Sequence, residues 1–299
     1  MLTPQFLKQL DPFYIHSKHP FRGKLRGERR SLNRGTGMEF ADHRAYEPGD
    51  DLRYVDWNIY ARLGRLFIKL HHTDEDLPIV LLLDRSRSME FGAPTKLTCA
   101  KQVAAALGYV ALAHADSVAV YTCAERLSLT LPPTSGKAQF PRLTRAITAI
   151  AAGGRTRLTE CLKQLPTYQR HRGMIVVFSD FLDPDSYTAG FKSLRGHGFS
   201  LTAIHVVSRE EIDPQTYLEN AATGNDWLME DAETGETKAI TINAEILTQY
   251  QTQQQAFCDN LQRFCTDQGI GYAQLKTDTP IETFVLEELH RTGLIQRNR

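Results

Sequence analysis

The stretch that decides the fold is Ile79-Val80-Leu81-Leu82-Leu83-Asp84-Arg85-Ser86-Arg87-Ser88-Met89. Its first half is an unbroken apolar run, which is typical of a strand buried on both faces of a parallel sheet. The Asp-x-Ser-x-Ser that follows is expected at the carboxyl end of that strand, where open α/β sheets place their ligand sites. Three oxygen donors on one short loop suit a hard cation such as Mg2+.

Strand-like and helix-like segments alternate downstream of this stretch. We expect further strands at 117–122, 126–131, 174–178, 201–207 and 271–275. We expect helices at 96–115, 139–150, 158–169, 186–196 and 244–268. The strands 117–122 and 126–131 lie close together in sequence, so they are expected to form an antiparallel edge before a break at Pro132–Gly136. The alternation predicts an α/β sheet with helices on both faces.

Two further patterns concern the second half of the chain. The segments 226–231 and 237–242 are expected to form a hairpin around Glu233–Glu236. A last helix is expected to begin at Pro280, with Thr279 as its N-cap and Glu282 completing a capping box.

Residues 1–76 do not resemble the start of such a domain, and we expect a small, β-rich and irregular N-terminal region there, followed by an α/β domain over 77–299. The segment Lys18–Arg34 carries seven Lys or Arg and a single acidic residue, Glu28. It is either a solvated arm or a docking surface for an acidic partner or phosphates. A turn at Pro48–Asp50 predicts short strands or a hairpin, and 64–70 is typical of a strand.

Acidic and histidine clusters in this region offer weaker metal-site candidates. Asp50, Asp51 and Asp56 could bind a second cation, or they could pair with the basic side chains of Arg44, Arg53 and Arg62. His71 and His72 precede the acidic stretch Thr73–Asp76. Adjacent residues of a strand point to opposite faces, so a polar linker is the simpler interpretation of the histidine pair.

The composition indicates an ordinary soluble protein. The formal net charge is zero, with 35 basic and 35 acidic residues, so no overall field favours nucleic acid or a membrane surface. The five cysteines show no CxxC spacing, which favours reduced thiols and a cytoplasmic location. No apolar run approaches the length of a bilayer span and no signal peptide is recognisable, so we expect no membrane insertion.

Two more loops could join the first one in a single site. Gly153-Gly154-Arg155-Thr156 offers a tight backbone path and a hydroxyl ahead of a helix, and Ser179-Asp180 places a carboxylate at the end of an apolar strand. Each pattern alone is compatible with helix capping. Together, two carboxylates and three hydroxyls would fill five positions of an octahedral oxygen site and leave room for water or a partner's ligand.

This set resembles the metal-ion-dependent adhesion site of von Willebrand factor type A domains, whose fold is a doubly wound, Rossmann-like sheet. The resemblance implies that the ligands of Mg2+ (or Mn2+) are Asp84, Ser86, Ser88, Thr156 and Asp180, with Thr159 the alternative to Thr156. The departure is arginine at both intervening positions of the first loop, where small residues are usual. Arg85 and Arg87 would weaken metal binding or strengthen contact with an acidic partner.

The upstream stretch Arg44–Arg53, with Asp56-Trp57 and Ala61-Arg62, resembles the signature of the bacterial "domain of unknown function 58" family. The resemblance implies a cytoplasmic, non-enzymatic interaction protein that works beside a MoxR-type AAA+ ATPase in chaperone-like maturation of protein complexes. A partner's Asp or Glu would complete the metal's coordination, with no role for nucleic acid. The alternatives are a metal-free interaction scaffold and a divalent-metal-dependent phosphoester hydrolase, although the loops contain no histidine to act as a base.

Overall fold

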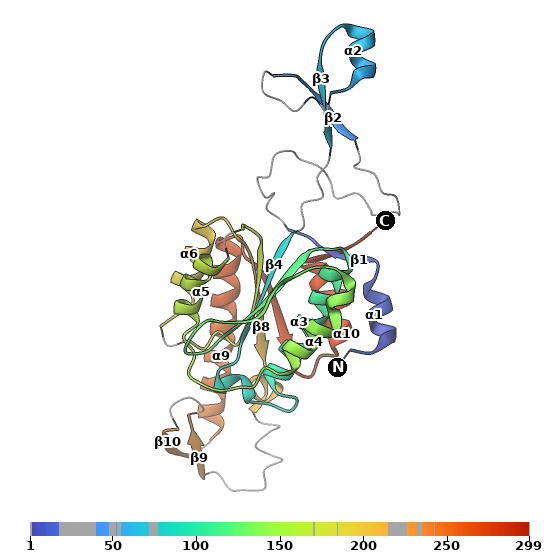
Figure 1. Ribbon diagram of the computed structural model, residues 1–299. Helices are drawn as coiled ribbons and strands as arrows, with labels where there is room; N and C mark the ends of the chain where they lie inside the picture. The colour runs from blue at the N-terminus through green and yellow to red at the C-terminus, as the bar shows by residue number, and fades with distance from the viewer. Residues whose placement is uncertain are drawn as a thin grey trace. The chain divides into compact units, whose positions relative to one another are not determined.

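The computed structural model describes residues 2–17, 40–47, 52, 55–71, 77–169, 171–183, 185–214, 226–231, 235–241 and 243–298. The chain divides into two compact units, of which the larger comprises Met1–His19 with Leu77–Arg299 and the smaller Pro20–Asp76. Figure 1 shows both units. Among the residues that the structure describes, no helix is long and apolar enough to span a bilayer.

The larger unit is built on a six-stranded sheet with the order β11-β8-β7-β4-β5-β6. In that order the strands are Gly271–Lys276, Ser200–Val207, Met174–Ser179, Pro78–Asp84, Ser117–Cys123 and Ser128–Thr134. All neighbours pair in parallel except β5 and β6. The direction in which the chain adds strands reverses between β4 and β7, and doubly wound sheets bind their ligands at this switch point.

Helices cover both faces of the sheet (Figure 1). The helices α5 (Leu158–Tyr168), α6 (Thr188–Gly196) and α9 (Ala244–Asp267) pack on one face, and α3 (Lys96–Ala113), α4 (Phe140–Thr148) and α1 (Pro4–Leu10) lie on the other. Alternate residues of β4 serve the two faces: Val80 and Leu82 join the core under α5, α6 and α9, whereas Leu81 faces α3. The predicted α/β, doubly wound class is confirmed.

Two strand pairings predicted for the larger unit are present. β5 and β6 form the expected antiparallel edge, and β9 (Asp226–Glu230) pairs with β10 (Thr237–Thr241) as the expected hairpin. The predicted break at Pro132–Gly136 begins too early, because β6 continues through both prolines to Thr134. An edge strand tolerates proline because one side of its backbone has no partner to bond.

The ends of the chain differ from the prediction. The last helix begins at Ile281 as α10 (Ile281–Thr283), with no side-chain cap, and continues as a π-helix over Phe284–Leu289, so the capping box of Thr279 and Glu282 is wrong. The strand β12 (Ile295–Arg297) pairs with β1 (Phe13–Ile15). This long-range pairing places the first residues of the chain in the α/β unit, whereas the sequence assigned them to a region over 1–76.

In the smaller unit, β2 (Phe40–Ala45) pairs antiparallel with β3 (Phe67–His71). The strand predicted at 64–70 is present as β3, three residues later at its start. Between the two strands lies α2 (Trp57–Leu63), a stretch for which the sequence predicted no element. Asp56 caps this helix, because its Oδ1 accepts the N–H groups of Asn58 and Ile59 at 2.9 and 3.2 Å, and its Oδ2 lies 3.0 Å from Nε2 of His43. Capping is therefore its observed role. Asp50, Asp51, His72, the acidic stretch 73–76 and the basic segment 18–34 lie outside the described residues.

Candidate functional site

The first and third predicted loops meet at the switch point of the sheet. Asp84 ends β4, and Ser179 ends the neighbouring strand β7. The hydroxyl of Ser179 donates to Oδ2 of Asp84 at 2.6 Å, while Oδ1 accepts the N–H of Ser86 at 2.9 Å. The side chain of Ser86 also hydrogen-bonds this carboxylate. Since each carboxylate oxygen has two lone pairs, Asp84 keeps one of its four for a further ligand.

The serine hydroxyls connect Asp84 to Asp180. Ser86 is buried, and its Oγ lies 3.0 Å from Oγ of Ser88. Ser88 is half-buried and lies in a short 3-10 turn, Arg87–Glu90. The hydroxyl of Ser88 in turn hydrogen-bonds the carboxylate of Asp180. The structure thus brings four of the five predicted ligands, Asp84, Ser86, Ser88 and Asp180, into one connected group.

The second loop is attached to the first by backbone hydrogen bonds. The N–H of Arg87 donates to the carbonyl of Gly154 at 3.1 Å, and the N–H of Gly153 donates to the carbonyl of Arg85 at 2.7 Å. Gly154 has φ +87°, a conformation that favours glycine. Thr156 follows on this attached loop and is buried.

Thr159, the alternative ligand, has a different task. Its N–H donates to Oδ2 of Asp183 at 3.0 Å, and its hydroxyl donates to the carbonyl of Ser186. Both bonds hold the segment after β7 against the start of α5. Thr159 therefore supports the third loop, and Thr156 remains the predicted ligand of the second.

The two buried carboxylates have opposite pKa shifts. Burial, with the charge of Asp180 adding to it, raises the pKa of Asp84 to about 7 despite the hydrogen bonds from Ser179 and Ser86. Burial would also raise the pKa of Asp180, but the ammonium of Lys96 holds it below its ordinary value. The ionised form of Asp84 is therefore disfavoured, because the hydrogen bonds of its neighbours do not fully offset its burial and the charge of Asp180.

Lys96 and Glu211 are parts of the site that the sequence analysis missed. Lys96 opens α3, is 1% exposed, and places its Nζ 2.7 Å from Oδ2 of Asp180 and 2.6 Å from Oε1 of Glu211. Burial alone would lower the pKa of Lys96, but these two carboxylates raise it. A cation at the amino end of a helix opposes the helix dipole, so the position of Lys96 in the first turn of α3 was the one local signal, and nothing in the nearby sequence names its acidic partners.

His205 lies beneath the site but belongs to the core. It is level with Ser179 in the parallel pairing of β7 and β8, and its Nδ1 lies 3.0 Å from the hydroxyl of Tyr272. The rings of Phe181 and Phe257 pack against it. Burial lowers the pKa of His205 to about 4, so the ring is neutral near pH 7.

His205 should make the chain sensitive to acid. Between pH 6.5 and about 4 the unfolded chain binds a proton at this position that the folded chain does not. Its contribution is present above pH 6.5 and is lost as the pH falls through about 4, and it amounts to about 3 kcal/mol. Urea denaturation at about pH 7.5 and about pH 4 measures the loss of free energy of unfolding between the two values. This loss should be smaller in His205→Gln than in the wild type. An equal loss in both proteins would contradict the assignment.

Four arginines lie on the first and second loops of the site. Arg85 is half-buried, and its Nη1 donates to the carbonyl of Ala151 at 3.1 Å, which ties the first loop to the segment before the second. Arg87, Arg155 and Arg157 are exposed. Glu125 lies against Gly154 as an opposing charge. We call these four arginines the arginine rim; its three exposed members keep their side chains available to a partner.

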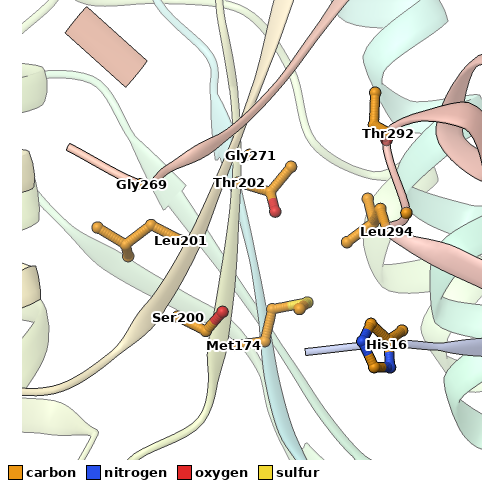
Figure 2. A pocket seen from close by; sticks show the side chains of 10 residues that line it. His16, Met174, Ser200, Leu201, Thr202, Gly269, Gly271, Thr292 and Leu294 are labelled. Carbon is orange, nitrogen blue, oxygen red and sulfur yellow. The ribbon is translucent and has the colours of Figure 1, made fainter. Parts of the chain in front are cut away.

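Two hollows accompany the sheet. An open hollow of about 410 Å³ lies beside the third loop, lined by Phe181, Leu182, Tyr187 and Phe257 among others. A cavity of about 20 Å³, with room for about one water molecule, lies at the amino ends of β7, β8 and β11. Figure 2 shows the side chains around this second cavity, which is at the opposite end of the strands from Asp84.

The donor set fits a divalent cation. Carboxylate and hydroxyl oxygens are the ligands that Mg2+ and Mn2+ prefer. When ionised, Asp84, Asp180 and Glu211 carry three negative charges, and Lys96 offsets one of them. The remaining two equal the charge that a divalent cation would neutralise. The raised pKa of Asp84 is the observation that marks this imbalance.

The chain is similar to known proteins in sequence and, more distantly, in structure. A family model described as "Protein of unknown function DUF58" matches residues 42–257. Uncharacterized proteins of Mycobacterium tuberculosis and Mycobacterium bovis are each 27% identical to the chain over 281 residues, 92% of this chain and 86% of theirs. The structure of the conserved hypothetical protein BatB from Bacteroides thetaiotaomicron is similar with a TM-score of 0.44 and 15% identity, covering 73% of this chain and 98% of BatB. The structure of a von Willebrand factor type A protein from Catenulispora acidiphila is similar with a TM-score of 0.34 and 16% identity, covering 44% of this chain and 33% of that protein.

Proposed function

The chain belongs to the family described as "Protein of unknown function DUF58", and from its site we propose that it is a non-enzymatic interaction module that binds an acidic protein partner through a divalent cation. Asp84, Ser86, Ser88, Thr156 and Asp180 would hold Mg2+ (or Mn2+). When bound, the ion supplies a positive centre with an open coordination position for a carboxylate. The single observation that carries the proposal is the buried, undercompensated carboxylate of Asp84 beside Asp180.

The residues of the chain divide this task among them. Asp84 and Asp180 provide charge, and the hydrogen bonds from Ser179 and Ser86 to Asp84 keep its carboxylate in one orientation. The attached second loop brings Thr156 to the same end of the sheet. Because these groups are held before a partner arrives, little ordering would be needed on binding.

We propose that the partner is a MoxR-type AAA+ ATPase, which the resemblance of the upstream signature implies. The arginine rim supports a partner that presents several acidic side chains, one for the ion and others for Arg87, Arg155 and Arg157. We further propose that binding occurs without turnover, since the buried ring of His205 is neutral and hydrogen-bonded in the core and so is a poor general base.

One observation favours the metal-free scaffold as a second candidate. The ammonium of Lys96 already lies against Asp180 and could act as the cation of the site. Thermal melts separate the two proposals, because only the metal-dependent module is stabilised by Mg2+ or Mn2+ relative to chelator.

The proposed function is tested by measuring binding to a purified MoxR-type ATPase from the same organism by biolayer interferometry. The wild-type chain should bind the ATPase in Mg2+ and lose this binding when chelator is added. Asp84→Asn should not bind the ATPase even in Mg2+, although wild type and variant both remain folded. Since the ATPase itself uses Mg2+ with its nucleotide, the chelator arm is run with nucleotide-free ATPase. Equal binding in all arms would reject the metal-bridged contact.

The arginine rim leads to a separate expectation about association rate. The double variant Arg87→Glu/Arg155→Glu should slow association with the ATPase by about tenfold at low salt, because like charges would then meet at the interface. The difference should shrink between about 50 mM and about 300 mM NaCl as screening increases. The double variant Arg142→Glu/Arg145→Glu, at two exposed arginines on α4, makes the same change in net charge and should leave the association rate unchanged. Equal slowing in the control would indicate an effect of net charge alone.

A further inference from the structure

Lys96 lies between two carboxylates that belong to different parts of the chain. Asp180 follows β7 at the candidate metal site, while Glu211 is in the short helix α7 (Arg209–Ile212). The ammonium of Lys96 is 2.7 Å from the first and 2.6 Å from the second. Both distances are those of charge-assisted hydrogen bonds, so neither carboxylate has an evident advantage.

Glu211 is held in place by its own helix. Its Oε2 accepts the N–H of Ser208 at 2.8 Å, and its N–H donates to the hydroxyl of Ser208 at 3.1 Å, which forms a capping box. The next residue toward the N-terminus, Glu210, accepts the N–H of Ala93 just before α3 at 3.2 Å. Glu211 is therefore a fixed anchor for Lys96 and does not depend on the metal site for its position.

Asp180 has two competing uses. Its Oδ1 accepts the N–H of Leu182 at 3.2 Å, and its Oδ2 holds the ammonium of Lys96. An ion at the site would need the same carboxylate. Two cations cannot share one buried carboxylate at full strength, because each repels the other at short range. The strength of the bond between Lys96 and Asp180 therefore opposes metal binding, and the bond between Lys96 and Glu211 relieves that opposition.

We propose that Lys96 and Glu211 set the affinity of the site for its divalent cation, Lys96 as an internal competitor for Asp180 and Glu211 as the group that draws Lys96 away. This inference rests on the proposed function, since it concerns the same metal site. It assigns a positioning role to two residues outside the predicted ligand set. It also links the metal site to α7, because the fixed carboxylate of Glu211 takes part of the charge of Lys96 away from Asp180.

The two residues are expected to act in opposite directions. Lys96→Met removes the competitor and should tighten Mn2+ binding by about tenfold or more, as measured by isothermal titration calorimetry. Glu211→Gln leaves Lys96 with Asp180 as its remaining charged partner and should weaken Mn2+ binding by about tenfold. The double variant should behave like Lys96→Met, because Glu211 acts only through Lys96. These magnitudes are those of a close charge interaction in a partly buried site.

Matched controls separate this effect from general damage. Lys101→Met removes another lysine of α3, whose Nζ donates to the carbonyl oxygens of Thr148 and Ile150. Glu210→Gln changes the neighbouring carboxylate. Neither should alter the Mn2+ affinity. If Lys96→Met does not fold, Glu211→Gln still decides, since unchanged or tighter binding there would overturn the inference.

The outcomes distinguish this inference from the proposed function. Mn2+ binding by the wild type with no change in either variant would overturn the role of Lys96 and Glu211 and leave the metal site standing. Binding that is absent in the wild type but present in Lys96→Met would uphold the competition and reject a metal-loaded wild type. Absence of binding in every variant would reject both.

Discussion

Asp84→Asn is expected to abolish the stabilisation that Mg2+ gives the wild-type chain. With Mg2+ at about 100 times its dissociation constant, the wild type should gain about 2.7 kcal/mol in free energy of unfolding, and the variant none. Asparagine keeps the shape of the side chain and an oxygen for the N–H of Ser86, but it removes the charge that a cation needs. Urea denaturation in Mg2+ and in chelator measures the difference.

The same variant has the opposite effect when no divalent cation is present. A pKa of Asp84 raised from 3.8 to about 7 means that its ionised form is disfavoured by about 4 kcal/mol in the folded chain. At about pH 8 in chelator, Asp84→Asn should therefore be more stable than the wild type, by about half of that amount after loss of its charged hydrogen bonds. Asp185 is an exposed carboxylate that, like Asp180, follows β7, and Asp185→Asn is the control. It should change neither the stabilisation by Mg2+ nor the free energy of unfolding in chelator.

These opposite effects of Asp84→Asn in Mg2+ and in chelator distinguish a metal ligand from a structural carboxylate. A purely structural Asp84 would make the variant less stable in both solutions by the same amount. Equal stabilisation of variant and wild type by Mg2+ would remove Asp84 from the ligand set.

Gly173→Ala is expected to destabilise the chain by about 3 kcal/mol. Gly173 precedes β7, and a Cβ there would overlap the backbone carbonyl of Pro78 at the start of β4. A backbone oxygen cannot rotate away as a side chain can, so the two strands would have to separate. Since β4 and β7 carry Asp84 and Asp180, the variant should also bind Mn2+ more weakly.

Gly196→Ala is the matched control for this substitution. Gly196 ends α6, and a Cβ there meets nothing within 4 Å. Alanine should leave the stability unchanged or raise it by up to about 1 kcal/mol, because it restricts the unfolded chain. The free energies of unfolding of both variants are obtained from their urea midpoints, provided that the m-value is unchanged. A Gly173→Ala variant as stable as the wild type would contradict the close pairing of β4 with β7.

The parts of the site that local sequence predicts are those that follow a buried strand. The run Ile79–Leu83 is apolar at every position because both of its faces are covered, and Asp84 stands out directly after it. The same holds for the apolar run Met174–Phe178, which is followed by Ser179 and Asp180. Parallel strands align their carboxyl ends, so two such carboxylates could be expected to meet without knowledge of the structure.

The rest depends on contacts between distant segments. Lys96 has the sequence context of a solvated helix start, and only the approach of Asp180 and Glu211, 84 and 115 residues away, makes it part of the site. The pairing of β1 with β12 joins the two ends of the chain in the same way. The resemblance prefers Thr156 to Thr159 as the ligand of the second loop, and the bond from Thr159 to the carbonyl of Ser186 shows the other task of Thr159.

The most direct test of the metal-dependent module is a titration of Mn2+ with the purified chain, followed by electron paramagnetic resonance. We expect the signal of free Mn2+ to decrease until one ion is bound per chain. Mg2+ should restore the signal by displacing Mn2+, and the signal should stay that of free Mn2+ with Asp84→Asn. A signal that remains that of free Mn2+ at every concentration of folded wild-type chain would contradict a metal site in this protein.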